Sequence, residues 1–368
     1  MEEEKLYWLA FSVFEGIGPK RFALLLKYFG SARAAWQAKR LLLLKTGLNQ
    51  PLVEKLIKFR RDFDPAAYFQ LLKGKAIGLL FLDEDNYPVN LKNTDNPPFI
   101  LYVRGQILKQ DRRALAVVGT RRMSAYGGQA CESLTAELAS MGLAIVSGLA
   151  RGIDSVAHKT ALAAKGRTIA VLGSGIDFIY PPENKYLAER IVAEGGVLVS
   201  EYPLGTKPVL GYFPARNRII AGLSLGVLVV EGAEKSGSLI TARLAAEQGR
   251  EVFAVPGPIY SPGTRAPAHL IKLGAKLVLS AADVLSELRI DRAVAGRQRK
   301  RETSPSVDEE KILSLLTLEP KHLDQLTRES GLTTGEATSL MTMMEIKGMV
   351  RDLGGMIYIK TKKIKTGG

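Results

Sequence analysis

Cysteine and histidine are scarce in this sequence of 368 residues. The one cysteine, Cys131, has no partner in the chain for a disulfide, and a chain of this length buries a core without covalent staples. The three histidines are far apart in the sequence and form no metal-ligand motif, so we expect no bound metal. This composition excludes a small disulfide scaffold and favours a reducing compartment, the cytoplasm.

Long apolar runs are also missing. The longest covers residues 219–230, which is too short to span a bilayer. Residues 2–4 are glutamates, whereas a secretory signal begins with positive charge. We therefore expect neither export nor a membrane span.

Acidic residues are too few to balance the basic ones. Lys and Arg number 51 against 37 Asp and Glu, which gives a net charge of +14. A surplus of this size favours a polyanionic partner, with nucleic acid ahead of an acidic membrane surface. Hydrophobic residues at 46% and charged residues at 24% are otherwise typical of a globular protein.

Hydrophobic patterning predicts an α/β fold: an extended Rossmann-like, doubly wound, mostly parallel sheet with a helical domain before it and a winged helix after it. Short apolar runs at 114–118, 143–146, 168–172, 197–200, 226–231 and 252–255 alternate with helical patterns. The predicted parts are an N-terminal helical domain (1–72), the Rossmann-like domain (73–288), a basic linker (289–306), a winged helix (307–361) and a basic tail (362–368).

The flanking domains carry weaker signals. The turn at Gly16–Lys20 is typical of a helix-hairpin-helix element that binds phosphate, or equally of an ordinary Gly-Pro turn in an interaction module. In the winged helix, the recognition helix at 333–347 has one lysine and several methionines, which favours a packing or protein-contact face over base reading.

Small and basic residues follow the predicted strands. A hydroxyl and a guanidinium at a helix N-terminus form an anion site, because backbone N–H groups, the helix dipole and the charge converge on one phosphate. Since parallel strands end at one edge of a sheet, these loops predict a phosphate-binding rim for several phosphates of a chain. The residues concerned are Gly119, Thr120, Arg121, Arg151, Asn217, Arg218, Lys235, Ser236, Gly237 and Ser238.

Other chemistry is less well supported. The string at 173–178 lacks the third glycine of a dinucleotide fingerprint, so we expect no nucleotide cofactor. Asp154, Glu183 and Glu231 are the carboxylates available to a nucleotide or nucleoside-phosphate hydrolase, the alternative function. No nucleophile–base pair accompanies them, so we expect a binding protein without catalytic residues. Asp154 is predicted to cap the helix that follows it, and Tyr212 and Phe213 are candidates for base stacking, with a core role favoured for Phe213.

These strings resemble the DNA-processing protein A family, also called DprA or Smf. The resemblance rests on Gly119–Arg121, the string 147–154 with His158, Tyr180–Pro181, Phe213–Leu223, Lys235–Thr241 and Val255–Gly257, in order and at similar spacing. It implies a protein that binds single-stranded DNA, forms a homodimer and loads a RecA-type recombinase during natural transformation.

Matched residue by residue, the resemblance makes Arg121 the principal phosphate ligand. Asn217 and Arg218 would contact backbone or base, Lys235–Ser238 would complete the pocket, and Lys185 would add charge. Some members carry lysine where Pro182 stands here, so the basic contribution of that loop is reduced. The family's dimer interface corresponds to His269–Val278, where Ile271 and Leu277 are the apolar candidates.

Overall fold

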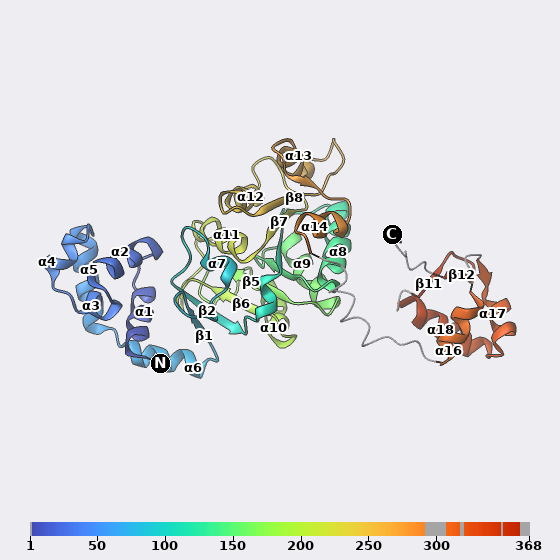
Figure 1. The fold of residues 1–368 in the computed structure, drawn as a ribbon, viewed down its shortest axis with the longest axis horizontal. Helices are drawn as coiled ribbons and strands as arrows, with labels where there is room; N and C mark the ends of the chain where they lie inside the picture. The colour runs from blue at the N-terminus through green and yellow to red at the C-terminus, as the bar shows by residue number, and fades with distance from the viewer. Residues whose placement is uncertain (1, 291–306, 317–319, 347–348, 361–368) are drawn as a thin grey trace. The chain divides into compact units, whose positions relative to one another are not determined.

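A computed structural model describes residues 2–290, 307–316, 320–346 and 349–360 (Figure 1). The chain divides into two compact units, residues 1–295 and 296–368. The basic residues predicted for the linker (Arg292 to Arg301) and for the tail after residue 361 lie outside the described residues. Among the described helices, none has the length and apolar character needed to cross a membrane.

The first unit contains a nine-stranded sheet in the order β1-β2-β6-β5-β4-β3-β7-β8-β9. Its strands are β1 (Gly78–Phe81), β2 (Ile100–Gly105), β3 (Ala114–Val118), β4 (Ala144–Ser147), β5 (Thr168–Leu172), β6 (Val197–Ser200), β7 (Gly226–Val229), β8 (Glu251–Ala254) and β9 (Lys276–Leu277). The helices around it are α7 (Val89–Lys92), α8 (Ala125–Ser140), α9 (Ile153–Ala163), α10 (Lys185–Ala193), α11 (Tyr212–Leu223), α12 (Gly237–Glu247), α13 (Arg265–Lys272) and α14 (Ala281–Glu287).

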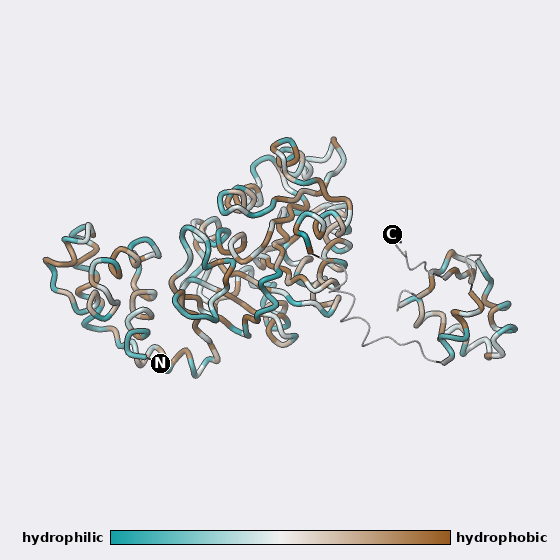
Figure 2. Tube along the Cα trace, in the orientation of Figure 1, coloured by the Kyte–Doolittle hydropathy of each residue, from teal (hydrophilic) through white to brown (hydrophobic). Residues whose placement is uncertain are grey.

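The central strands are parallel and buried along their whole length, because helices cover both faces of the sheet. On β3, Ala116 and Val118 pack with α11 and α12, whereas Leu115 and Val117 pack with α8 and α9. This explains why these strands are continuous apolar runs in the sequence. The mostly parallel sheet predicted above is confirmed, and Figure 2 shows its strands as predominantly hydrophobic.

Three strands of the sheet were not predicted. β2 pairs antiparallel with β6, and β1 pairs antiparallel with β2, so these two strands extend the sheet beyond β6. At the other end of the sheet, β9 pairs with β8. The stretch His269–Val278, which the resemblance assigns to the dimer interface, contains the end of the helix α13 and the strand β9. β9 escaped prediction because its two residues are both exposed, so it has no apolar pattern. β2 is a largely buried apolar run of six residues and β1 ends in two buried residues, so both carried a pattern that the prediction overlooked.

Six helices precede the sheet: α1 (Glu3–Val13), α2 (Pro19–Phe29), α3 (Ala32–Gln37), α4 (Arg40–Lys45), α5 (Gln50–Asp62) and α6 (Pro65–Gly74). α2 begins at Pro19, where a missing N–H costs nothing, and ends at Gly30 in the left-handed conformation. Trp8 packs edge-on against Phe81 and Phe99. The helices therefore share a hydrophobic core with the sheet's antiparallel edge.

The second unit is a winged helix, as predicted. It consists of α16 (Val307–Leu315), β10 (Lys321–His322), α17 (Leu323–Ser330), α18 (Thr334–Ile346), β11 (Val350–Asp352) and β12 (Ile357–Lys360), with a sheet in the order β10-β12-β11. Met341 and Met344 on α18 are fully buried against Leu326. Methionines of the predicted recognition helix thus form part of the core of this unit.

Candidate nucleic-acid interface

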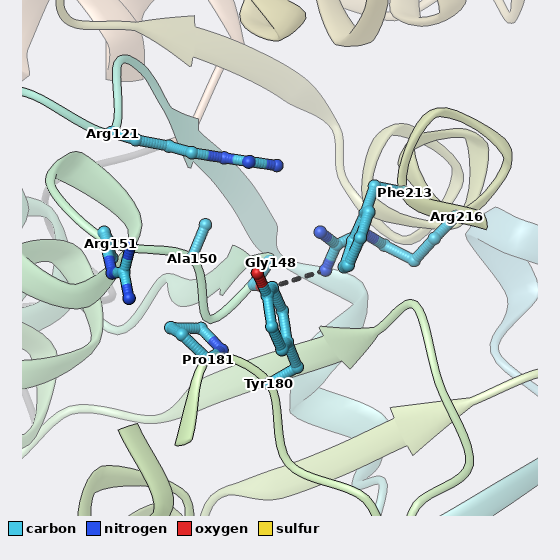
Figure 3. Close-up of a pocket in the computed structure, with 8 residues that line it drawn as sticks. All are labelled: Arg121, Gly148, Ala150, Arg151, Tyr180, Pro181, Phe213 and Arg216. Atoms are coloured by element: carbon cyan, nitrogen blue, oxygen red, sulfur yellow. Dashed lines mark hydrogen bonds between the residues drawn. The ribbon is translucent and has the colours of Figure 1, made fainter. Parts of the chain in front are cut away.

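Two adjoining hollows lie at the carboxyl ends of the parallel strands. The larger one, which we call the rim hollow, measures about 480 Å³ and is lined by residues 118–122, 235–238 and part of α11. The smaller one, the side pocket, measures about 30 Å³ and is lined by Arg121, Gly148, Ala150, Arg151, Tyr180, Pro181, Phe213 and Arg216 (Figure 3). Arg121 and Phe213 belong to both, so the two hollows form one continuous site.

Hydrogen bonds to the backbone and to the carboxylate of Glu231 fix the conformation of the loop after β3. Thr120 N donates to the Glu231 backbone oxygen at 2.7 Å, and the Glu231 carboxylate accepts from Ser124 N at 2.8 Å. Ser124 then caps α8 by accepting from Gly127 N. A Cβ on Gly119 would lie 2.8 Å from the Glu231 backbone oxygen, so the loop needs glycine at that position. The loop after β3 therefore leads directly into α8, as the pattern of a strand followed by a helix predicted.

Arg121 is exposed at the point where the two hollows meet. Its guanidinium carbon lies 5.6 Å from the centre of the Phe213 ring. Figure 3 shows the Arg121 side chain pointing toward that ring. No acidic side chain of the described residues forms an ion pair with it. Its positive charge is held in position by an aromatic face and remains available to an anion.

Most of the predicted rim residues meet in the rim hollow. Gly119, Thr120, Arg121, Asn217, Lys235, Ser236, Gly237 and Ser238 all line it. Ser236 caps α12 by accepting from Ser238 N, which leaves the start of that helix facing the hollow. Lys235 is exposed beside this cap. The hollow thus combines a helix N-terminus with three exposed cationic side chains from two strand ends: Arg121 and Arg122 after β3, and Lys235 after β7.

Three predicted residues lie apart from this group. Arg151 lines only the side pocket and forms an ion pair with Glu183, whose pKa the arginine holds below its usual value. Arg218 forms an ion pair with Glu201, donates to the Asn96 backbone oxygen at 2.7 Å and lines a separate cleft beside the turn between α1 and α2. Lys185 is exposed at the start of α10 and lines neither hollow.

A buried arginine beneath the site was not predicted. Arg216 is 4% exposed, and its Nη1 donates to the backbone oxygens of Gly148, at 2.7 Å, and of Val171. The Arg216 guanidinium packs directly against Gly148, because a Cβ added at Gly148 would lie 2.5 Å from Arg216 Nη2. Burial lowers the pKa of Arg216 to about 10, although the nearby Asp154 opposes the shift. Its spacing of three and four residues from the buried Ile219 and Ile220 on the same helix was the signal for its inward position.

The buried Asp154 lies in the same region as Arg216. The prediction that Asp154 caps α9 is wrong. α9 begins at Ile153, with Gly152 at the N-cap position. The Asp154 carboxylate instead accepts from Gly148 N at 3.1 Å and from Ala150 N at 3.4 Å. Burial raises its pKa, and Arg216 partly offsets that shift. Asp154 therefore shapes the loop after β4 rather than the end of the helix.

Phe213 lines the site instead of filling the core, contrary to the role favoured from the sequence. It is half-buried, and its ring centre lies 5.5 Å from that of Tyr180, which is also exposed to the side pocket. Tyr212 faces the separate cleft and stacks on Tyr202 at 4.3 Å. Tyr212 and Phe213, although adjacent at the start of α11, thus line different hollows. Phe213 is therefore the aromatic residue that contacts Arg121.

The carboxylates considered for a hydrolase have structural partners. Asp154 holds the loop after β4, Glu183 pairs with Arg151, and Glu231 accepts from Ser124 N. His158 is fully buried, and burial lowers its pKa to about 3, so it stays neutral at physiological pH. Its Nδ1 lies 2.7 Å from the Thr168 hydroxyl, which fixes it in the core.

Fold and site together define a Rossmann-like protein with a basic, open hollow at its strand ends and a winged helix after it. Comparison with known families assigns the chain within this class. The family model described as DNA recombination-mediator protein A matches residues 78–289, and that of the DprA winged helix domain matches residues 297–356. The chain belongs to the DNA recombination-mediator protein A family, as the resemblance indicated.

Individual relatives agree with this assignment. Protein Smf of Synechocystis sp. PCC 6803 is 36% identical over 96% of this chain and 98% of its own length. The X-ray structure of DNA processing protein A from Streptococcus pneumoniae matches with a TM-score of 0.66 and 36% identity, covering 78% of this chain and 98% of that one. A Helicobacter pylori DNA processing protein A, described as having a unique single-stranded DNA binding mode, matches with a TM-score of 0.52 and 32% identity over 58% of this chain and 95% of that one.

Proposed function

We propose that this protein binds single-stranded DNA at the rim hollow and side pocket, protects it and loads a RecA-type recombinase on it during DNA uptake. The observation that supports the proposal most is the position of Arg121. It is exposed, held against Phe213 and shared by both hollows. Lys235 and the start of α12 add a second anion-binding element within the same hollow.

A single strand fits this chemistry better than a duplex. Arg121 and Lys235 provide charge for phosphates, while Phe213 and Tyr180 provide faces for exposed bases. The H. pylori relative, whose description names single-stranded DNA binding, supports the same ligand here. The proposed site of action is the cytoplasm, where the recombinase and the incoming strand would meet.

We expect tighter binding to single-stranded DNA than to duplex of the same length. Because the affinity should rest on phosphate contacts, log Kd should change with log salt concentration with a slope of about 0.7 per phosphate neutralised. Filter binding or fluorescence anisotropy at two salt concentrations, with a labelled oligothymidine and a matched duplex, measures both quantities. Equal affinity for the two forms at about 0.15 M salt, the physiological ionic strength, would contradict the proposal.

The hydrolase alternative has a separate test. Its carboxylates are engaged in structural contacts, so we expect no turnover of nucleotides or nucleoside phosphates by the purified protein. Release of base or inorganic phosphate at a rate proportional to protein concentration would favour the hydrolase over the binding protein.

The recombinase-loading step is tested by strand exchange on DNA already coated with a single-strand-binding protein.

We also propose a homodimer through α13 and β9. β9 is the last strand in the sheet order, and Leu273, Leu277 and Leu279 around it are 71%, 41% and 76% exposed. An apolar groove of about 430 Å³ between α12 and α13 adjoins Leu273. Ile271, the other candidate from the sequence, is half-buried and packs partly against the core. Such a patch suits an isologous interface.

The dimer prediction is best tested at the exposed positions. Leu273→Arg together with Leu277→Arg should give a monomer in sedimentation velocity, because the symmetric contact would bring like charges face to face. The thermal unfolding midpoint should remain near that of the wild type, since neither side chain is buried. A double variant that remains dimeric would show that the interface lies elsewhere.

A further inference from the structure

The loop after β8, residues 255–264, displays two large apolar side chains to solvent. Tyr260 is 93% exposed and its neighbour Ile259 is 78% exposed. Single exposed apolar residues are common on protein surfaces, but they are usually carried by loops with few constraints. This loop is different, because it is fixed to the parts of the chain that build the rim hollow.

Several contacts fix the loop. Gly232 N donates to Gly263 O at 2.6 Å, and Ala266 N donates back to Gly232 O at 2.8 Å. Gly232 follows β7 and leads to Lys235, so these bonds connect the Tyr260 loop to the loop that carries the rim lysine. The Tyr126 hydroxyl, from the first turn of α8, donates to Pro256 O. The Tyr260 loop is therefore bonded to the loop that carries Lys235 and to α8, the helix that follows the Arg121 loop.

The loop is also braced internally. The buried Thr264 hydroxyl lies 2.9 Å from Pro258 O and 2.8 Å from Ser261 O. A Cβ on Gly257 would lie 2.3 Å from Thr264 Cγ2, so the chain is closely packed at that point. Three prolines, at 256, 258 and 262, restrict the backbone further. Ile259 and Tyr260 thus lie on a preorganised tip, which lowers the entropic cost when a ligand binds them.

The position of the loop suggests its ligand. β8 runs parallel to β7, and β7 to β3, so their carboxyl ends share one edge of the sheet. Neighbouring strands are about 4.8 Å apart, which places the end of β8 about 10 Å from that of β3. A nucleic-acid strand advances at least about 3.4 Å per nucleotide, so about three nucleotides cover this distance. Arg265, exposed directly after the loop, adds positive charge close to it in the chain.

We propose that Tyr260 is a stacking platform for a base of the same single strand, several nucleotides beyond the phosphate held at Arg121. The inference rests on the proposed function and extends it: the bound strand runs along the sheet edge from the rim hollow across β7 to β8. Ile259 packs beside the stacked base, and Arg265 neutralises a phosphate near it. The contact is sequence-tolerant, because every base has a face that stacks on tyrosine.

The test uses a thymidine dinucleotide, which is shorter than the stretch of about three nucleotides between the ends of β3 and β8, and an oligothymidine of about 16 nucleotides, the upper limit of the site sizes common in single-strand-binding folds. Tyr260→Ala should weaken binding of the longer oligonucleotide by about 5-fold to 150-fold, the range for removal of one base–aromatic stack, and leave the shorter one unchanged. Tyr260→Phe should bind both like the wild type. Tyr28→Ala, at an exposed tyrosine of the N-terminal helices, is the matched control and should change neither.

A direct readout is also available. The chain's two tryptophans, Trp8 and Trp36, are buried, so Tyr260→Trp adds one exposed fluorophore that the longer oligonucleotide should quench. Unchanged affinity of Tyr260→Ala for the longer oligonucleotide, or an unquenched signal from the introduced indole, would overturn the proposal. Dissociation of the dimer in Tyr260→Ala would overturn it too, because the loop would then contact a second copy of the chain. If the wild type binds neither oligonucleotide, the proposed function itself fails.

Discussion

Arg121→Ala should weaken binding of single-stranded DNA by about 1.5 to 3 kcal/mol, the scale of a hydrogen bond to a charged group, or about 10-fold to 150-fold in Kd. The side chain is exposed and borders both hollows, so the substitution removes a phosphate ligand without opening a cavity. The salt dependence should flatten by about 0.7 in slope for each phosphate that is no longer neutralised. Anisotropy titrations at several salt concentrations measure both effects.

Arg113→Ala is the matched control for this experiment. Arg113 is exposed and precedes β3, so it lies at the opposite, amino end of the strand that leads to Arg121. The substitution removes the same charge but should leave affinity within about twofold of the wild type. Arg121→Lys should be intermediate, because lysine keeps the charge but lacks the planar fork and the stacking on Phe213. Equal effects of the two alanine variants would indicate non-specific attraction by the +14 net charge.

Arg216→Met should lower the free energy of unfolding by about 3 to 5 kcal/mol, the scale of removing one member of a buried charged network. Methionine fills a similar volume but leaves the backbone oxygens of Gly148 and Val171 without their donor. It also leaves the buried Asp154 carboxylate without its nearby positive charge. Equilibrium unfolding in urea, followed by circular dichroism, measures the destabilisation.

Two further variants separate this effect from a general effect of removing an arginine. Arg243→Met, at a side chain that is 71% exposed on α12, should change the free energy of unfolding by no more than about 0.5 kcal/mol. Adding Asp154→Asn to Arg216→Met should cost less than the sum of the two single changes, since the residues belong to one network. An Arg216→Met variant as stable as Arg243→Met would show that the buried guanidinium does not hold the strand ends together.

The rim was predictable because its chemistry is local. A glycine, a hydroxyl and a basic residue between a strand and a helix specify an anion site wherever the strand ends, and parallel strands end at one edge. In the structure Gly119–Arg121 and Lys235–Ser238 line one hollow, and their role as phosphate ligands stays a prediction. Arg218 was placed with them because of its sequence neighbours. The structure separates it, since residues one position apart on a helix, such as Asn217 and Arg218, point about 100° from each other.

Local sequence patterns specify the fold class, the order of the domains and the strands at whose ends the candidate site lies, because buried parallel strands must be continuous apolar runs. Which charges remain available to a ligand depends on how the chain folds. Arg151 and Arg218 are paired with Glu183 and Glu201, and those partners lie 32 and 17 residues away in the chain. Arg216 is buried beneath the site for the same reason: its partners, Gly148 and Val171, lie in or just after strands that only folding brings beside α11. The partners of these arginines lie in distant segments of the chain, and no local pattern encodes which groups they meet.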